Sequence, residues 1–406
     1  MTIGCCTNLY PPFARGGAEV IGLRVVRELH ARGHDVFVLS TYPFSGWGSW
    51  HAHLTERHIE RVYRFFPPNI YHTLNDYRFP LPVRAVWHGI DLFSPFPCWE
   101  ARSVFLREKP DIVLTHNLKG LGLSMVQELK REGIPHLHTL HDVQLSVPSG
   151  LLLHPDEAQT VSPLRRLYEK ATKRAFGSPE VVISPSKFLA DFHQSRGFFP
   201  ASHVEVLPNP APMFATTALP LRQPGKLRLL FAGQLETHKG IRFLIETLKS
   251  SPCAFELHIA GEGRWSDWVA REAQNDPRFV YHGFVPLDHL SRLLAICDYT
   301  IVPSICAENS PTIIYESLQA GIPVIASEVG GIGELVQDGE QGYLFAQDST
   351  EGFLRTFERA YHEVDLWRAR QNQLRAKVEQ FTLARYVDRL EELMQIAQNR
   401  QKRHLR

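Results

Sequence analysis

The 406-residue chain lacks the features that define several large classes of protein. Its apolar runs all fall short of the ~20 residues that cross a bilayer. Its start, MTIGCCTNLY, has no basic region before the apolar residues, so we expect no signal peptide and a cytoplasmic location. A formal net charge of +1 argues against a strongly basic nucleic-acid-binding domain. The six cysteines are scattered without a Cys-x-x-Cys pair, which is typical of reduced thiols rather than of a disulfide frame.

Common nucleotide- and metal-binding motifs are absent as well. The first 40 residues follow the strand, glycine loop, helix and strand order of nucleotide-binding folds, with a helix predicted over Ala18–Arg32 that carries Ile21, Val25 and Leu29 on one face. This opening does not spell G-x-G-x-x-G and has no Walker A lysine, so a generic dinucleotide or ATP site is not supported. The chain also has no Asp-x-Asp pair, and we therefore expect no metal cofactor.

The chain does contain enough residues for two α/β domains. Its apolar content of 44% and charged content of 21% are ordinary for a globular protein. Short β-branched runs alternate with helical patterns, which predicts parallel sheets. The proline-rich segment Ala211–Gly225 is the best candidate for a boundary. We predict one domain over 1–207, a second over 208–382, and a final helical segment over 383–406.

The most informative stretch is Pro303–Gly331, PSICAENSPTIIYESLQAGIPVIASEVGG. It follows a strand-like run and continues as polar loop, helix and strand, an order in which ligands bind at the carboxyl ends of the strands. Glu308 falls in the loop, and Glu316 is expected about two turns along the helix, near the same face. Pro311 is expected in the first helical turn, whose free N–H groups suit an anion such as a phosphate. From spacing alone, solvated glutamates are the commoner explanation of such a pair.

The strings ENSPTIIYE and AGIPVIAS, followed by Gly330 and Gly331, resemble the donor-binding signature of family 4 of the retaining glycosyltransferases. The resemblance covers nearly the whole chain and is faint only across Thr41–Pro97. It implies the GT-B fold, in which two Rossmann-like domains with parallel sheets face each other across a cleft and the last helix crosses back to the first domain. It also implies metal-independent transfer of a sugar from a nucleotide diphosphate sugar to a hydroxyl acceptor, such as a glycan, a glycolipid or a lipid-linked saccharide.

The resemblance assigns roles to residues of the second domain. In the family, residues at the positions of Glu308 and Glu316 bind the donor sugar's hydroxyls and the ribose, and Lys239 lies on the diphosphate. Gln234 stands where the family has an arginine that also binds the diphosphate, so Lys239 must carry more of the charge. The remaining donor-binding residues implied by the resemblance are Gly233, Gly283, Val285, Asn309, Ser310, Pro311 and Thr312.

In the first domain, the resemblance places Gly16 and Gly17 against the donor diphosphate and His141 against the transferred sugar. From the residues alone, the two glycines are as readily explained by a turn that needs a positive φ. His136 and His138 alternate on a predicted strand over His136–Leu140, and a packed strand-face pair is favoured over a zinc site that would include His141. Glu308 and His141 are the predicted catalytic residues, and no protein nucleophile is expected.

The segment Thr41–Pro97 is predicted to be irregular, because it is rich in aromatic residues and proline, and to bind the acceptor. Its histidines, His51, His53 and His58, are expected to be loop residues rather than metal ligands. The basic tail QNRQKRHLR leaves two interpretations open, a frayed solvated terminus, which is favoured, and peripheral contact with an anionic inner membrane surface.

Three other functions compete with a glycosyltransferase. A sugar-nucleotide epimerase shares the GT-B layout, although the string ENSPTIIYE fits transferases better. A phosphorylase would need a pyridoxal phosphate lysine and usually a longer chain. A catalytically silent sugar-nucleotide-binding protein is conceivable because of Gln234. For a glycosyltransferase, the function that we favour, the expected partners are a nucleotide-sugar donor and a saccharide or lipid-linked acceptor.

Overall fold

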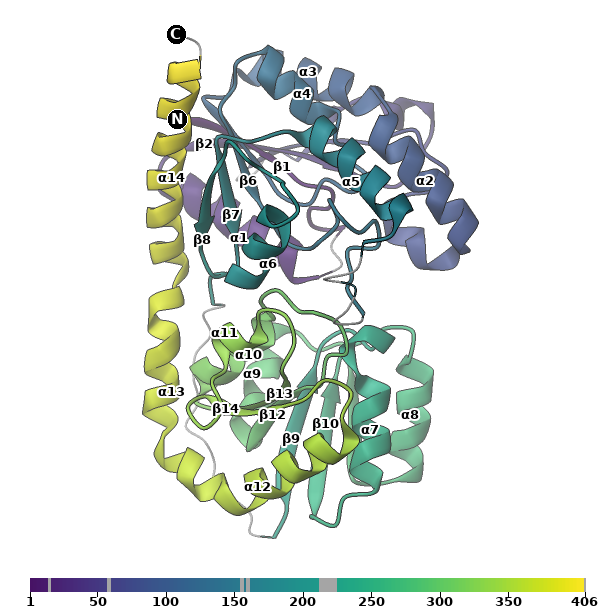
Figure 1. Ribbon diagram of the computed structural model, residues 1–406, viewed down its shortest axis with the longest axis vertical. Coiled ribbons are helices and arrows are strands. Elements are labelled where there is room, and N and C mark those ends of the chain that lie inside the picture. Colours follow the sequence, from purple (N-terminus) through teal and green to yellow (C-terminus); the bar gives the residue numbers. More distant parts are fainter. Residues whose placement is uncertain (14–15, 57–59, 154–156, 158–160, 212–224, 405–406) are drawn as a thin grey trace. The chain divides into compact units, whose positions relative to one another are not determined.

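The computed structural model describes residues 1–13, 16–56, 60–153, 157, 161–211 and 225–404 (Figure 1). The chain divides into two compact units. Unit 1 comprises Met1–Leu151, Ala158–Pro208 and Leu383–Arg406, and unit 2 comprises Leu152–Glu157 and Asn209–Thr382. His58, residues 212–224 of the predicted boundary and the last two residues of the tail lie outside the described residues.

Unit 1 is built on a sheet with the strand order β3-β4-β2-β1-β5-β6-β7-β8 in the described residues. All neighbouring strands in this order run parallel except β3 and β4, which are antiparallel. The strands are β1 (Thr2–Cys6), β2 (Asp35–Thr41), β3 (His53–Glu56), β4 (Arg61–Phe65), β5 (Ile112–Thr115), β6 (His136–Thr139), β7 (Val181–Ser184) and β8 (His203–Val206). The helices are α1 (Gly17–Ala31), α2 (Leu81–Phe93), α3 (Phe96–Glu108), α4 (Met125–Arg131), α5 (Pro163–Phe176), α6 (Lys187–Gln194) and α14 (Leu383–His404).

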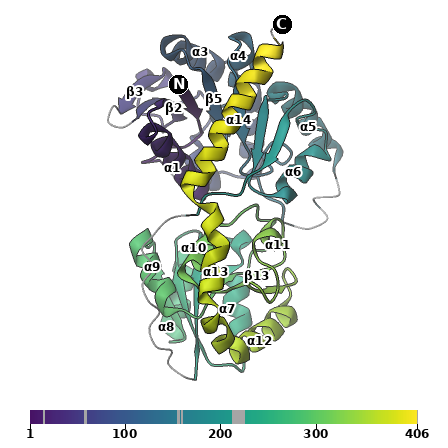
Figure 2. The same ribbon diagram turned by 90° about the vertical axis from the view of Figure 1, so that its left-hand side faces the viewer.

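Helix α14 packs against α1 although more than 350 residues separate them in the sequence (Figure 2). The predicted apolar face of α1, Ile21, Val25 and Leu29, is buried in a cluster that includes Leu390, Leu393 and Met394 of α14. At the rim of this contact the Arg32 guanidinium forms ion pairs with Asp388 at 2.6 Å and Glu391 at 2.9 Å. Apolar burial therefore holds α14 on unit 1, and the partly exposed ion pairs add little energy.

The expectation that Thr41–Pro97 is irregular is wrong. This segment contributes β3 and β4 to the sheet and forms the 13-residue helix α2. Its prolines do not prevent a helix, because Pro80 is the N-cap of α2 and Pro82 lies in its first turn, where a missing N–H costs nothing. The aromatic residues form a packed core, in which Tyr71 stacks between Phe79 and Trp87.

Unit 2 is built on a sheet with the strand order β11-β10-β9-β12-β13-β14, with all pairs parallel in the described residues. Its strands are β9 (Leu227–Ala232), β10 (Phe255–Ala260), β11 (Phe279–Gly283), β12 (Tyr299–Val302), β13 (Val324–Ser327) and β14 (Gly342–Phe345). Its helices are α7 (Ile241–Lys249), α8 (Ser266–Asn275), α9 (Leu287–Ile296), α10 (Thr312–Ala320), α11 (Ile332–Leu335), α12 (Thr350–Ala369) and α13 (Gln371–Val378).

The strand order of unit 2 reverses direction at β9. This strand pairs with β10 on one side and with β12 on the other, so the loops that follow β9 and β12 leave the sheet side by side. In open α/β sheets such a reversal point opens a crevice at the carboxyl ends of the strands, where ligands bind.

Candidate functional site

Lys239 and Glu308 meet at the point where the strand order of unit 2 reverses. Lys239 follows β9 and Glu308 follows β12, and their Nζ and Oε1 atoms are 2.5 Å apart. The side chain of Lys239 is 27% exposed and that of Glu308 is 11% exposed. Two residues that are 69 positions apart in the sequence thus form a partly buried ion pair at the carboxyl edge of the sheet.

The loop that carries Lys239 is fixed against the loop that carries Glu308. Gly240 has φ of +75°, and a Cβ atom there would lie 1.8 Å from the carbonyl oxygen of Pro303. Only glycine fits both the left-handed conformation and this close approach. The Ile305 amide donates to the His238 carbonyl at 2.9 Å, which ties the two loops together beside the ion pair.

The main chain of Glu308 is held by the glycine pair that ends the signature. The Gly331 amide donates to the Glu308 carbonyl at 2.6 Å. Gly330 has φ of +56°, and a Cβ atom there would lie 2.2 Å from the same carbonyl oxygen. On the side-chain side, the Ser304 hydroxyl donates to the Glu308 carboxylate at 2.7 Å. The conformation of Glu308 is therefore set by contacts from three segments of unit 2.

Both members of the ion pair are charged near neutral pH. Burial opposes ionisation of the Glu308 carboxyl, but the Lys239 ammonium and the Ser304 hydroxyl outweigh it and hold the pKa of Glu308 below its usual value. Burial likewise opposes the charge on Lys239, and the Glu308 carboxylate outweighs it and raises the pKa of Lys239. The site therefore presents a cation and an anion next to each other.

Helix α10 begins at Thr312 with Pro311 as its N-cap, one residue later than predicted. As predicted, Glu308 lies in the loop that follows β12, where loop contacts hold its side chain. Glu316 is the fifth residue of α10 and lies little more than one turn along the helix, so the expectation of about two turns is wrong. The N-cap Pro311 makes no side-chain hydrogen bond to the first-turn N–H groups of α10, the groups that suit an anion at a helix N-terminus.

The other predicted donor-binding residues follow strands of the same sheet. Gly233 and Gln234 come directly after β9, Gly283 ends β11, and Val285 follows it, while Asn309, Ser310, Pro311 and Thr312 lead into α10. Ser310 exchanges a hydrogen bond with the Tyr315 hydroxyl at 2.8 Å, and its carbonyl accepts from Asn209 at 3.5 Å. The predicted site residues of unit 2 thus lie at or just after the carboxyl ends of β9, β11 and β12, except for Thr312, which begins α10, and Glu316, which lies within it.

Two glycines after β10, Gly261 and Gly263, permit close packing at the carboxyl edge of the unit 2 sheet. A Cβ atom at Gly261 would lie 1.9 Å from the Gly233 carbonyl oxygen, and one at Gly263 would lie 2.7 Å from that of Leu235. The Leu235 amide donates to the Glu262 carbonyl at 2.9 Å. The backbone of Gly233 and Gln234 is therefore held in place by the turn after β10.

In unit 1, His141 pairs with a histidine that sequence reasoning missed. His141 follows β6 and His116 follows the neighbouring strand β5, and their Nε2 and Nδ1 atoms are 2.9 Å apart. Burial lowers the pKa of His116 to about 4, and burial together with His116 lowers that of His141 to about 3. Both rings are therefore neutral near pH 7. The position of His116 at the carboxyl end of a predicted strand is the signal that could have identified it.

Asp142 fixes the chain directly after His141. Its carboxylate accepts from the Asn117 side chain at 3.1 Å and from the Gln144 amide at 2.7 Å. Burial raises the pKa of Asp142 to about 6 despite the Gln144 amide. A cavity of about 20 Å³, enough for one water molecule, is lined by these residues together with His116 and His141.

Gly16 and Gly17 form the start of α1. Gly16 is the N-cap with an extended backbone (φ −159°), and its amide donates to the Glu19 carboxylate at 2.8 Å, the half of a capping box that a glycine can form. The alternative that these glycines serve a turn with positive φ is wrong, because Gly16 is extended and Gly17 is helical. Glu19 therefore orders the N-terminus of this helix.

His136 and His138 are packed within the fold. Both rings form hydrogen bonds with the Thr115 hydroxyl, at 2.6 and 2.8 Å, and both contact the Phe176 ring. The preference for a packed strand-face pair is confirmed. Within the described ranges, no group of three or more His, Cys, Asp or Glu residues has a geometry that could hold a metal ion.

Two family descriptions match this chain. Residues 15–212 match "Glycosyltransferase Family 4" and residues 226–363 match "Glycosyl transferases group 1". The chain therefore belongs to the glycosyltransferase group 1 and family 4 proteins. It is a glycosyltransferase of the hexosyltransferase type (EC 2.4).

Relatives of similar length exist in bacterial surface-polysaccharide systems. An uncharacterized 42.6 kDa protein in the cps region of Klebsiella pneumoniae is 26% identical over 337 residues, which cover 82% of this chain and 87% of that protein. The putative teichuronic acid biosynthesis glycosyltransferase TuaC of Bacillus subtilis is 25% identical over 400 residues, which cover 91% of each chain.

Solved structures show the same fold at low sequence identity. Sucrose-phosphate synthase from Thermosynechococcus elongatus has a TM-score of 0.74 and 16% identity, with 97% of this chain and 98% of that chain covered. Anabaena Alr3699/HepE in complex with UDP-glucose has a TM-score of 0.65 and 16% identity, with 97% and 99% covered. The fold class is GT-B. None of the helices in the described parts of this chain has the length and apolar content needed to traverse a bilayer.

Proposed function

We propose that this glycosyltransferase takes a sugar from a nucleotide diphosphate sugar and transfers it to a hydroxyl acceptor with retention of the anomeric configuration. The observation that carries the proposal is the Lys239–Glu308 ion pair at the reversal point of the unit 2 sheet. A nucleotide diphosphate sugar presents an anion next to a group rich in hydroxyls. A cation and a carboxylate side by side are complementary to those two parts.

In this proposal, the chain's own groups stabilise the leaving diphosphate. Lys239 contributes a full positive charge, and the N-terminus of α10 contributes N–H donors and the positive end of the helix dipole. Glu308 accepts hydrogen bonds from the donor sugar, and Glu316 binds the ribose. The absence of an Asp-x-Asp pair from the sequence supports charge neutralisation by protein groups rather than by a bound metal ion.

We propose that His141 contacts the transferred sugar as a neutral ring. A pKa near 3 leaves the imidazole uncharged, so it exchanges hydrogen bonds with sugar hydroxyls and does not act as a cationic acid. In retaining transfer by front-face attack, the leaving phosphate accepts the proton of the acceptor hydroxyl. The protein then needs no nucleophile, and its task is to position the donor and stabilise the developing charge.

A saccharide or lipid-linked acceptor is supported by two relatives, the putative teichuronic acid biosynthesis glycosyltransferase TuaC and a lipopolysaccharide 1,2-N-acetylglucosaminetransferase of Salmonella typhimurium that is 28% identical over 206 residues. The UDP and UDP-glucose complexes of Alr3699/HepE make UDP sugars the first donors to test.

A thermal-shift panel of UDP, GDP, ADP and their glucose conjugates, with and without EDTA, tests the donor site. Binding to the folded state raises the melting temperature by mass action. We expect a shift with one nucleotide family that survives EDTA. No shift with any of these sugar nucleotides would contradict the proposal, and a shift without turnover would favour a silent binding protein, the function that Gln234 makes conceivable.

A further inference from the structure

The buried face of α5 is polar. Arg165, Tyr168, Glu169 and Thr172 follow the i, i+3, i+4, i+7 spacing of one helical face, and Glu169 and Thr172 are 5% and 0% exposed. Leu164 and Leu167 of the same helix are 77% and 65% exposed. A surface helix normally buries its apolar stripe and exposes its polar one. Burying polar groups costs free energy unless they are paired, so the buried polar side chains of α5 are expected to have hydrogen-bond partners.

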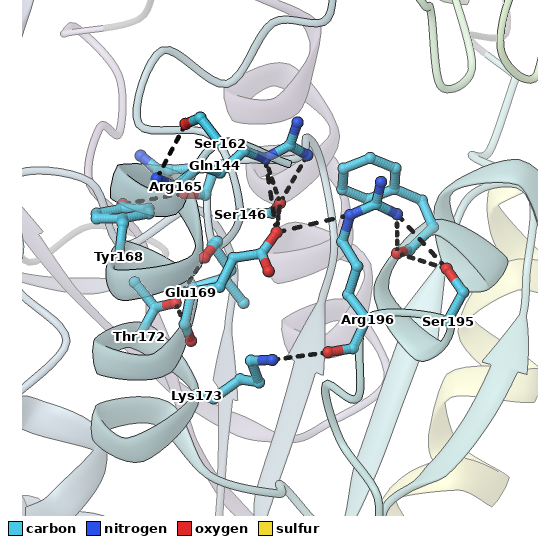
Figure 3. Close-up of polar contacts among 12 residues, drawn as sticks. Gln144, Ser146, Ser162, Arg165, Tyr168, Glu169, Thr172, Lys173, Ser195 and Arg196 are labelled. Carbon is cyan, nitrogen blue, oxygen red and sulfur yellow. Dashed lines mark hydrogen bonds and ion pairs between the residues drawn. The ribbon is translucent and has the colours of Figure 1, made fainter. Parts of the chain in front are cut away.

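The partners are consecutive residues of the loop that begins at His141 (Figure 3). The Tyr168 hydroxyl donates to the Gln144 carbonyl at 3.0 Å, and the Thr172 hydroxyl donates to the Leu145 carbonyl at 2.6 Å. The next residue, Ser146, is fully buried, and its hydroxyl donates to the Glu169 carboxylate. The face of α5 therefore binds residues 144–146 one after another.

The Glu169 carboxylate is itself held between two guanidinium groups (Figure 3). Arg165 of α5 and Arg196, which follows α6, lie 3.5 and 3.6 Å from it, and all three side chains are at most 12% exposed. Arg165 also donates to the Ser146 hydroxyl at 2.9 Å, and the Arg196 guanidinium lies 3.7 Å from the centre of the Phe192 ring. These contacts leave the carboxylate that accepts from Ser146 little freedom to move.

His141 lies between this anchored run and the end of the sheet. The Leu140 amide donates to the Ile183 carbonyl of β7 at 2.8 Å, so the chain is still fixed to the sheet one residue before His141. From Gln144 onward it is fixed to α5. The backbone at His141 is thus held on both sides, which limits the directions in which its ring can point.

We infer that the buried polar face of α5 fixes residues 144–146 and thereby orients His141 for sugar transfer, so that Tyr168, Glu169 and Thr172 are positioning residues of this enzyme. The inference rests on the proposed role of His141. It predicts that loosening these contacts disturbs the loop and the rate of transfer before it disturbs donor binding.

The test compares three variants of the whole protein. Tyr168→Phe/Thr172→Val removes both hydroxyls that donate to the loop carbonyls and nearly conserves volume. Lys170→Met is the matched control, because Lys170 lies on the same helix and is exposed to solvent. Thr172→Ser keeps the hydroxyl and should match the wild type.

Hydrogen exchange of the peptide that spans residues 142–150 gives the first readout. The amides of Ser146, Val147 and Gly150 are protected by hydrogen bonds to Val143 and Val147 carbonyls at 2.8–2.9 Å. We expect exchange there to become about tenfold faster in the double variant, because two hydrogen bonds are lost, and to stay unchanged in Lys170→Met and Thr172→Ser. Equal exchange in the double variant and the wild type would overturn the inference.

Slow hydrolysis of UDP-, ADP- and GDP-glucose, in which water takes the place of the acceptor hydroxyl and the nucleotide diphosphate is released, gives the second readout. We expect kcat of the double variant to fall about tenfold with KM nearly unchanged. A wild type that turns over one of these donors and a double variant with the same kcat would overturn this inference alone. A wild type that binds and turns over none of them would overturn the proposed function, and with it the role assigned to the loop.

Discussion

The two units present chemically different groups at the carboxyl edges of their sheets. Unit 2 offers charge, in the ion pair between Lys239 and Glu308, and electrostatic attraction keeps both groups ionised. Unit 1 offers the neutral pair His116 and His141, which burial keeps uncharged. The contrast teaches that one parallel-sheet architecture can set opposite charge states, depending on whether the buried group has an oppositely charged partner. It also predicts that substitutions in the two units affect different steps of the reaction.

The largest expected effect is that of His141→Ala on turnover. If the ring contacts the sugar in the transition state, kcat should fall about a hundredfold or more, as when one preorganised donor is removed from an active site. UDP affinity, measured by calorimetry, should change little, because His141 is assigned to the transferred sugar and not to the nucleotide. His289→Ala, which changes a largely exposed histidine of unit 2, is the control. A His141→Ala variant that loses UDP affinity and keeps kcat would contradict the assignment of His141 to the transferred sugar.

Lys239→Met should weaken binding instead. A charge-assisted contact contributes about 1.5–3 kcal/mol, so the dissociation constant for the bound nucleotide diphosphate should rise about ten- to a hundredfold. Lys249→Met is a matched control, since this lysine also forms an ion pair, with Glu272, but lies at the other end of α7. Isothermal titration of both variants checks the expectation, and equal affinity in the Lys239 variant and the wild type would speak against its diphosphate role.

Glu316→Ala should have a smaller effect on the same step. Loss of a hydrogen bond to the ribose should raise the dissociation constant about tenfold. The exposed Glu351, which begins another helix of unit 2, provides the control substitution Glu351→Ala. A ribose role also requires that Glu316→Ala leave the affinity for inorganic diphosphate unchanged, and a parallel loss of diphosphate affinity would contradict it.

The smallest expected effect is on the pH dependence of stability. The pKa values of His116 and His141 are about 4 and 3 in the folded protein, against 6.5 ordinarily, so the unfolded chain binds more protons as the pH falls below about 6.5. The free energy of unfolding should therefore decrease as the pH falls from about 6.5 to about 4. In His116→Asn/His141→Asn this slope should be shallower, as measured by urea unfolding. An unchanged slope would mean that these rings are not buried in the neutral form.

The fold class and the location of the site could be predicted from the sequence because both depend on short-range patterns. Alternation of β-branched runs with helical patterns is a short-range property, and the residue that follows a parallel strand always lies at the carboxyl edge of its sheet. Glu308, Lys239 and His141 could thus be assigned to loops at such edges. The prediction of an irregular segment over Thr41–Pro97 was wrong because proline occurs both in loops and in the first turn of helices, and the sequence does not distinguish the two.

By itself, then, the sequence determined the order of the elements, the glycosyltransferase signature and the residues available at the strand ends. Tertiary structure alone decided their partners: Lys239 with Glu308, His141 with His116, Gly331 with the Glu308 carbonyl, and the polar face of α5 with residues 144–146. Each of these contacts joins residues that are 19 or more positions apart. Which loops become neighbours depends on the lateral order of the strands, and that order is fixed by packing of the whole unit rather than by any local pattern.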